Sequence, residues 1–332
     1  MQARESVTPQ TFGATWFSIV GAPRCGTTSL ARYLSSHPDI CFSSPKEPHF
    51  FSRRDLREHP ANEVCKLVRE QYLDRFFQTR VSGAVLAEGS VSYLYTPEQM
   101  LPAMTMWPDA RFILAVRSPL EMLPSLHQRN LYNGDETVRD FARAWSLVED
   151  RRMGRSIPRT CLDARLLDYK EIGLLGKHVR RFFDAVGRHR CFVSVFDDLV
   201  AAPREQYARI LDFLGLSGQF PEEFPVHRAG NQVRFGWLQR LLKRPPNAVR
   251  AMLASDAYLT RENGQADLEP KQGRQRIATI RKRLLKWNRT SAPPKKLDQH
   301  LRREMCEWFR DDVLELSALV GRDLRHWLAP AE

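Results

Sequence analysis

The sequence predicts an α/β fold: a doubly wound parallel sheet of about five strands, flanked by helices, with a helical C-terminal extension. Two observations predict it. Short, continuously apolar runs alternate with stretches of helical spacing, which is typical of a parallel sheet covered on both faces. These runs end before residue 218, after which Pro, Lys and Arg become frequent. We therefore expect a single domain over residues 1–332, with a core at 16–217 and a basic helical extension at 218–330.

The expected strands are short and buried. Each run is rich in Val, Ile, Leu, Phe or Ala, and a glycine or a polar residue follows it. The five runs are Trp16–Val20, Ile40–Phe42, Val85–Ala87, Arg111–Val116 and Cys191–Phe196.

Apolar residues at helical spacing predict helices between these runs. Beyond residue 218 we expect no strands, and a tail that packs back on the sheet domain. The expected helices of the core are Thr27–Ser36, Val64–Phe77, one from Pro119 onward, 140–150 and 170–186. The expected extension comprises a basic helix at Arg281–Trp287, a Pro/Lys linker at Thr290–Lys296 and an amphipathic helix at Leu297–Leu328.

Composition excludes several classes of protein. The 332 residues carry a net charge of +12 and are 42% hydrophobic, which excludes collagen-like, low-complexity and wholly disordered chains. No apolar run approaches the ~18–20 residues of a membrane span, and the N-terminus lacks a signal-peptide core. The six cysteines form no CxxC pair, so neither a zinc site nor a disulfide framework is indicated. These features predict a non-secreted, cytoplasmic protein.

The positive charge is concentrated towards the C-terminus. Residues 228–303 hold 19 Lys and Arg against five acids, and Arg274–Lys296 holds no acid. This segment can be a solvated helix face, or it can attract an anionic ligand, an anionic acceptor or a membrane surface. We expect it to face the entrance for an acceptor; plain surface charge is the alternative. Peripheral membrane contact stays open, and the sequence does not indicate an oligomeric state.

A phosphate-loop motif follows the first expected strand. Gly21-Ala-Pro-Arg-Cys-Gly-Thr-Thr nearly matches G-x-x-x-x-G-K-[ST]. Its glycines let the backbone wrap an anion, and the helix N-terminus supplies N–H groups and partial positive charge. A tight turn with a threonine cap is the structural alternative. The candidate anion-binding residues are Arg24, Cys25, Gly26, Thr27, Thr28 and Ser29.

The motif lacks the lysine of nucleoside triphosphatases. Thr27 occupies that position, and the cation nearest to it in the loop is Arg24. A second anion site is predicted after the fourth strand, where Arg117 and Ser125 can converge on a phosphate. The alternative is an arginine salt bridge beside a serine on the helix surface.

The loop after the second strand carries Lys46, Glu47 and His49 within four residues. A carboxylate fixed at the strand ends suits a general base. Lys46 can neutralise charge on the transferred group, and His49 can orient Glu47 or accept the proton itself. A surface loop whose two phenylalanines fill the core is the alternative. Residues 88–94, after the third strand, supply further polar groups or structural caps.

Three stretches in this order, Ala22–Leu30, Lys46–Phe51 and Phe112–Ser125, resemble the sulfotransferases that use 3′-phosphoadenosine 5′-phosphosulfate (PAPS). They are most similar to the carbohydrate branch, which includes heparan sulfate sulfotransferases and bacterial homologues. The resemblance runs from Phe17 to about Leu328. It implies a P-loop-like fold and in-line transfer of a sulfuryl group from PAPS to a hydroxyl or amine. The implied acceptor is a saccharide, glycolipid or small metabolite.

The resemblance also implies roles by position. Residues Arg24–Ser29 would hold the 5′-phosphosulfate, with Arg24 stabilising the departing bisphosphate. Arg117 and Ser125 would hold the 3′-phosphate, and Glu47 would be the base. No metal and no nucleic acid are expected. Two alternatives remain: an ATP-dependent small-molecule kinase with a degenerate phosphate loop, and a non-catalytic binder of anions or nucleic acid that uses the basic C-terminal third.

Overall fold

The structure is a computed structural model that describes residues 12, 15–78, 84–218, 220–225, 231–243, 272–291 and 297–329, with the backbone alone at 231–233, 272–278 and 291. The chain divides into two compact units. Unit 1 comprises residues 1–119, 174–227 and 309–332, and unit 2 comprises residues 120–173 and 228–308. Residues from 309 onward thus group with the sheet, as expected of the tail, whereas 228–308 group with 120–173. The prediction of a single domain stays a prediction.

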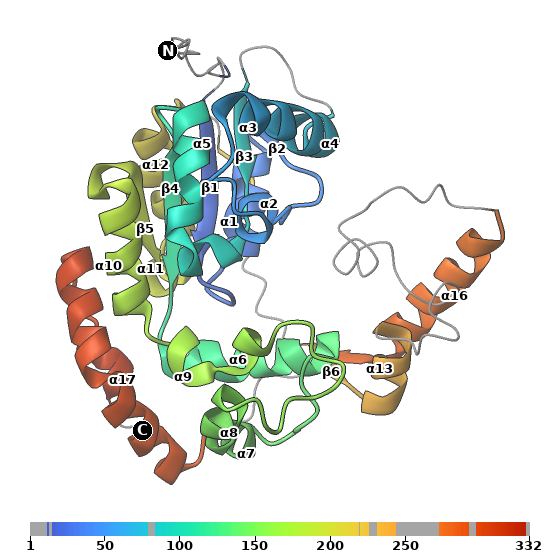
Figure 1. Cartoon of the computed structure of the whole chain (residues 1–332). Coiled ribbons are helices and arrows are strands. Elements are labelled where there is room, and N and C mark those ends of the chain that lie inside the picture. Colours follow the sequence, from blue (N-terminus) through green and yellow to red (C-terminus); the bar gives the residue numbers. More distant parts are fainter. Residues whose placement is uncertain are drawn as a thin grey trace, which may run out of the picture. The chain divides into compact units, whose positions relative to one another are not determined.

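Unit 1 contains the expected parallel sheet (Figure 1). The strand order is β2-β3-β1-β4-β5, and every neighbouring pair is parallel. The chain runs from β1 to β2 on one side of the sheet, and after β3 it crosses to β4 on the other side of β1, so a ligand crevice is expected at the carboxyl end of β1. The predicted fold class is therefore confirmed. The strands are β1 (Trp16–Gly21), β2 (Ile40–Phe42), β3 (Val85–Glu88), β4 (Arg111–Val116) and β5 (Cys191–Val195).

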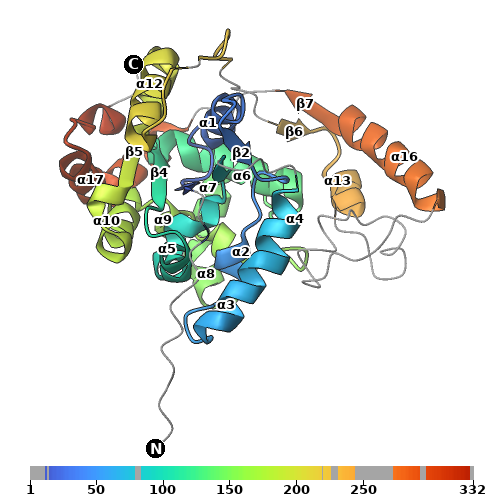
Figure 2. The same cartoon turned by 90° about the horizontal axis from the view of Figure 1, so that it is seen from above.

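Helices cover both faces of this sheet. Figure 2 shows α1 and α12 on one face and α5 and α10 on the other. The helices of unit 1 are α1 (Thr27–Ser35), α2 (Phe50–Arg53), α3 (Ala61–Val68), α4 (Asp74–Phe76), α5 (Leu101–Met106), α10 (Leu175–Val186), α11 (Phe196–Ala201), α12 (Pro203–Leu214) and the end of α17 (Gln299–Val320). A π-helical turn, Arg69–Leu73, joins α3 to α4, and 3-10 turns form Val91–Tyr95, Pro97–Met100, Arg188–Arg190 and Arg325–Leu328.

Aromatic side chains dominate the core of unit 1. Trp16 is fully buried, stacks on Trp107 at 5.4 Å between ring centroids, and meets Phe112 edge-on at 5.9 Å. Such pairs stabilise a fold beyond the roughly 25 cal/mol per Å² of buried apolar surface. The continuous apolar runs read from the sequence are thus strands buried on both faces. This rigid core fixes the loops that follow each strand.

Unit 2 is organised around a buried ion pair. Arg151 Nη1 lies 2.9 Å from Glu136 Oε2, and Tyr169 Oη donates to the same oxygen at 3.1 Å. Its helices are most of α6 (Pro119–Asn133), α7 (Phe141–Ser146), α8 (Val148–Arg152), α9 (Tyr169–Ile172), α13 (Gly236–Lys243), α16 (Gln272–Asn288) and the start of α17 (Gln299–Val320), with a 3-10 turn at Ala164–Leu167.

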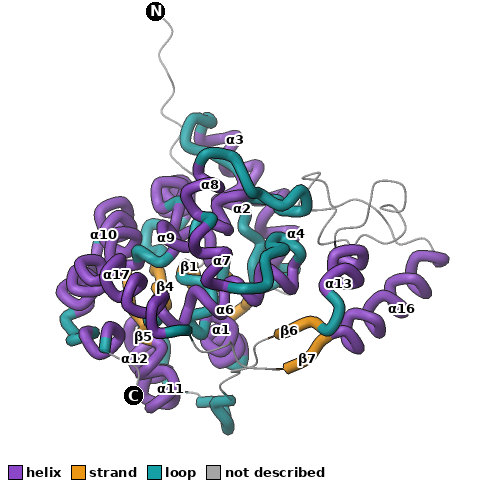
Figure 3. The backbone as a smooth tube through the Cα atoms, turned by 90° about the horizontal axis from the view of Figure 1, so that it is seen from below, coloured by secondary structure: helices purple, strands orange, loops and turns teal. Residues whose placement is uncertain are grey.

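Two expectations for the C-terminal third are wrong. Strands do occur beyond residue 218, because β6 (Asn231–Val233) pairs antiparallel with β7 (Arg289–Ser291) (Figure 3). Three polar-rich residues per strand are too few to give an alternating pattern. The last helix ends at Val320 rather than Leu328, because Gly321 adopts a left-handed φ of 70° and terminates it. The rest of the expected linker, residues 292–296, lies outside the described residues.

Candidate active site

The phosphate loop turns sharply between β1 and α1. Arg24 and Gly26 both have left-handed backbones, with φ of 66° and 86°. A Cβ on Gly26 would lie 2.7 Å from Leu199 Cδ2, so both backbone and packing require glycine there. The N–H groups of Ser29 and Leu30 bond to the Gly26 carbonyl at 2.9 and 3.1 Å. This strand-to-helix turn is the geometry in which helix N-termini bind anions.

The six predicted loop residues differ in exposure. Thr27 and Ser29 are buried, whereas Thr28 is exposed. Burial raises the pKa of the Cys25 thiol to about 12, although Arg117 and Arg24 oppose this rise. Cys25 is therefore a neutral thiol, and its contribution to an anion site would come from its backbone N–H.

Lys46 links the loops that follow three neighbouring strands. Its Nζ lies 2.8 Å from Glu47 Oε1, 3.3 Å from Thr27 Oγ1 and 3.3 Å from the Gly89 carbonyl oxygen. A Cβ at Gly89 would approach Lys46 Cε to 2.8 Å, so glycine makes room for the lysine. The structure thus brings the predicted Lys46, Glu47 and Thr27 together.

Glu47 is an ionised carboxylate whose side chain is 37% exposed. Its Oε2 lies 3.4 Å from His49 Nε2. Desolvation raises the pKa of Glu47, but His49 and Lys46 outweigh it and lower that pKa to about 2. The carboxylate is therefore charged at neutral pH and remains within reach of a small molecule.

His49 is fixed by a chain of hydroxyl groups. It has a left-handed φ of 55°, and its backbone N–H donates to Ser90 Oγ at 2.8 Å. Its Nδ1 lies 2.7 Å from Ser92 Oγ, which is 2.7 Å from Ser52 Oγ. The hydroxyls hold one side of the imidazole, and Nε2 is left on the side of Glu47.

A second carboxylate, Glu88, is deeply buried at the end of β3. Tyr72 and Tyr93 donate their hydroxyls to Oε1 at 2.8 and 2.9 Å, and Ser90 donates to Oε2. Burial raises the pKa of Glu88 to about 7, and the nearby Glu47 carboxylate adds to the rise. The sequence alone predicts only further polar groups or structural caps at this strand end. The available signal was an acid ending a buried run, followed two residues later by Ser90.

Arg117 connects the end of β4 to the phosphate loop. Its Nη1 donates to the Arg24 carbonyl at 3.4 Å, and its guanidinium carbon lies 4.3 Å from the centroid of the Phe196 ring. Its predicted partner, Ser125, is buried on α6 within unit 2. Their joint role at a 3′-phosphate stays a prediction.

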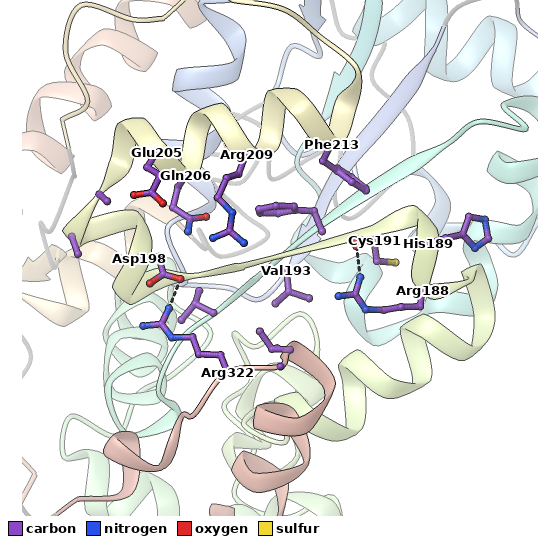
Figure 4. A pocket seen from close by; sticks show the side chains of 16 residues that line it. Arg188, His189, Cys191, Val193, Asp198, Glu205, Gln206, Arg209, Phe213 and Arg322 are labelled. Carbon is purple, nitrogen blue, oxygen red and sulfur yellow. Dashed lines mark hydrogen bonds and ion pairs between the residues drawn. The ribbon is translucent and has the colours of Figure 1, made fainter.

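A cavity of about 730 Å³ lies beside β5 in unit 1 (Figure 4). Residues of β5, α11, α12 and the end of α17 line it, including the ion pair of Asp198 with Arg322. None of the predicted site residues lines this cavity. We therefore place the candidate active site at the carboxyl ends of β1, β2, β3 and β4. Open parallel sheets bind their ligands at this edge.

A family comparison identifies the chain. The model described as "Sulfotransferase family" matches residues 17–222, which is more than half of the sequence. The chain belongs to the sulfotransferase family. The resemblance carried by the three motifs is therefore confirmed at the level of the family, and the match favours sulfuryl transfer over the kinase and nucleic-acid alternatives.

This sulfotransferase is similar to curated and solved proteins. It is 29% identical over 209 residues to human heparan sulfate glucosamine 3-O-sulfotransferase 6, covering 60% of this chain and 51% of the relative. It is 23% identical over 250 residues to human carbohydrate sulfotransferase 15, covering 60% and 43%. The chain thus spans about half the length of these relatives. A sulfotransferase from Alicyclobacillus acidocaldarius is 25% identical with a TM-score of 0.61, covering 96% of this chain and 100% of that one.

Two features are missing from the part of the chain that the structure describes. No helix there combines the length and apolar character that crossing a bilayer requires. No group of three or more His, Cys, Asp or Glu side chains there is arranged to hold a metal ion.

Proposed function

We propose that this sulfotransferase transfers the sulfuryl group of PAPS to a hydroxyl, or to an amine, of a saccharide, glycolipid or small metabolite. One observation carries the proposal. Lys46 Nζ lies within hydrogen-bonding distance of both Thr27, on the phosphate loop, and Glu47, the candidate base. A cation between an anion-binding loop and a carboxylate suits a reaction in which negative charge develops at a phosphate while a proton leaves the acceptor.

The residues of the phosphate loop fit such a donor. The N-terminus of α1, the buried hydroxyls of Thr27 and Ser29, and the Arg24 guanidinium form a donor set suited to phosphate and sulfate oxygens. Arg117 follows β4 on the adjacent strand and contacts the same loop. PAPS supplies a sulfuryl group attached to a phosphate that leaves as part of the bisphosphate.

Glu47 would remove the acceptor proton while the new sulfur–oxygen bond forms and the bond to the 5′-phosphate breaks. Lys46 and Arg24 would stabilise the negative charge that accumulates on the leaving phosphate. An anion at the loop would also draw the Lys46 ammonium away from Glu47. Because Lys46 helps to lower the pKa of Glu47, this sharing would make the carboxylate a stronger base when the donor is bound. His49 Nε2 would keep the carboxylate oriented.

The acceptor class draws its support from relatives. The curated relatives carry the names of heparan sulfate and carbohydrate sulfotransferases, which favours a glycan acceptor. A turnover assay with PAPS over pooled glycans, glycolipids and phenols would identify the class. If no product forms with any of these acceptors at a PAPS concentration that saturates the protein, the proposed acceptor classes are wrong.

Nucleotide binding tests the donor site separately. We expect 3′-phosphoadenosine 5′-phosphate to bind well and ATP to bind poorly. Losing a charge-assisted contact of ~1.5–3 kcal/mol should make Arg117→Ala weaken the bisphosphate about tenfold or more. Isothermal calorimetry measures both, with Arg204→Ala on α12 as the control variant. Equal affinity for nucleotides with and without the 3′-phosphate would overturn the assignment.

A further inference from the structure

Over residues 279–288, helix α16 in unit 2 buries two polar residues and exposes three apolar ones alongside its charged side chains. Arg281 and Asn288 are buried against α13. Arg281 Nε donates to the Leu242 carbonyl at 3.0 Å, and Asn288 Nδ2 donates to Gln239 Oε1 at 3.1 Å. The exposed side is formed by Ile280, Leu284 and Trp287, which are 57%, 38% and 51% exposed. These three positions recur at i, i+4 and i+7, so they form one continuous stripe.

A neighbouring aromatic side chain extends this stripe. Phe235, also exposed, stacks on Trp287 with 5.8 Å between ring centroids and an interplanar angle of 17°. Trp237 and Leu241, which are 62% and 36% exposed, add separate apolar surface on α13. Contiguous apolar surface of this kind on a protein marks an interaction site rather than ordinary exposure.

Positive charge borders the stripe, and the described segments that form it contain no acid. Lys282, Arg283 and Lys286 are exposed on the adjoining side of α16. Residues 231–243 and 272–291 together carry ten Lys and Arg and no Asp or Glu. A solvated helix would normally intersperse acids that form i,i+4 pairs, and this one forgoes them. The expected basic face is thus only partly right: Arg281 is buried and does not belong to it. Whether this segment faces an acceptor entrance stays a prediction.

We propose that the α16 surface, formed by Phe235, Ile280, Leu284, Trp287, Lys282, Arg283 and Lys286, binds the surface of an anionic phospholipid bilayer. An interfacial helix has this composition: tryptophan and aliphatic residues that enter the headgroup boundary, flanked by lysine and arginine that pair with lipid phosphates. Two aliphatic side chains in the stripe favour lipid over a sugar chain, which stacks on flat aromatic rings. The bilayer proposal does not depend on which acceptor the enzyme sulfates.

Vesicle co-sedimentation of the 332-residue chain tests this surface. The probes are phosphatidylcholine vesicles with and without 30 mol% phosphatidylglycerol, over a range of salt concentrations. We expect binding to the anionic vesicles that weakens as salt rises. Each cation near a charged bilayer contributes about a fivefold factor, so the triple variant Lys282→Gln, Arg283→Gln, Lys286→Gln should lower partitioning at least tenfold. Ile280→Ser with Leu284→Ser should lower it by a similar factor.

Matched controls separate a specific surface from general charge. The triple variant Lys66→Gln, Lys177→Gln, Arg204→Gln removes the same charge from other exposed positions, and Trp308→Ser removes a tryptophan that is 42% exposed on α17. Both should bind anionic vesicles like the unmodified chain. Circular dichroism verifies that the variants fold. The salt dependence is measured on the unmodified chain, so that test does not depend on the folding of any variant.

Three results would overturn the proposal. The first is equal binding, or none, to neutral and anionic vesicles. The second is tighter binding to soluble heparin than to vesicles, with no effect of the Ile280 and Leu284 changes on either; this would assign the surface to a glycan. The third is a dimer in sedimentation that the Ile280→Ser, Leu284→Ser variant dissociates, which would make the surface an interface between copies.

Discussion

The loop after β2 and the last residue of β3 each present a glutamate at the same edge of the sheet, and the two carboxylates have opposite environments. Glu47 is 37% exposed and lies beside Lys46 and His49. Glu88 is fully buried and accepts hydrogen bonds from the uncharged hydroxyls of Tyr72, Tyr93 and Ser90. The pKa of Glu47 is lowered to about 2, whereas burial raises that of Glu88 to about 7. His49 and Lys46 outweigh desolvation at Glu47, whereas the neutral hydroxyl donors do not outweigh it at Glu88.

This difference separates a chemical role from a structural one. Glu47 can exchange its partners for a substrate because those partners are themselves partly exposed. Glu88 has no such access, but the Ser90 hydroxyl that donates to it also accepts the backbone N–H of His49. Glu88 therefore holds the loop in which Glu47 and His49 stand. It is a positioning residue in the proposed reaction.

The largest expected effect is on turnover at Glu47. Glu47→Gln keeps the volume of the side chain and removes its basicity, so PAPS turnover should fall by about 10²–10⁴-fold while bisphosphate affinity stays the same. Steady-state kinetics and calorimetry measure the two quantities. Glu63→Gln, on α3 and half exposed, is the matched control and should change neither. Near-normal turnover in Glu47→Gln together with loss of turnover in His49→Ala would make the histidine the base.

The next effect is on stability at Glu88. Glu88→Ala would leave the buried hydroxyls of Tyr72, Tyr93 and Ser90 without their acceptor, which should cost about 3 kcal/mol of unfolding free energy. Glu88→Gln keeps an acceptor oxygen and should cost clearly less. Urea denaturation measures both variants. An unchanged midpoint in Glu88→Ala would mean that the hydroxyl network does not stabilise the sheet edge.

How much of this comparison the sequence could predict depends on how far apart in the sequence the contacting residues lie. The strands were predictable because their apolar runs are continuous, and Lys46, Glu47 and His49 were predictable because they are neighbours in one loop. The network of Glu88 was not, since Tyr72 lies on a separate helical turn and nothing local pairs the two residues. The prediction that Arg281 lies on a solvated face was wrong for a related reason. A cation at helical spacing indicates a solvated face, and only the folded structure shows its bond to the Leu242 carbonyl.

Glu88 should also make stability depend on pH. Its pKa is raised in the folded state, so between about 4.5 and 7 the folded chain holds a proton that the unfolded chain has lost. The contribution is therefore full below pH 4.5 and is lost as the pH rises to 7, by about 3 kcal/mol at most. The denaturation midpoint followed over this window should fall in the unmodified chain and stay flatter in Glu88→Gln. Equal slopes in both would show that Glu88 does not titrate there.

The smallest effect is expected at His49. It distinguishes a histidine that orients Glu47 from one that accepts the proton itself. If the imidazole only holds Glu47, His49→Ala should lower turnover about tenfold, less than Glu47→Gln. It should also remove a contact that lowers the pKa of Glu47, so that this pKa moves from about 2 towards its ordinary value. Activity at pH 5 relative to pH 8 should then fall further in His49→Ala than in the unmodified chain. A merely structural histidine would reduce both activities by the same factor and leave their ratio unchanged.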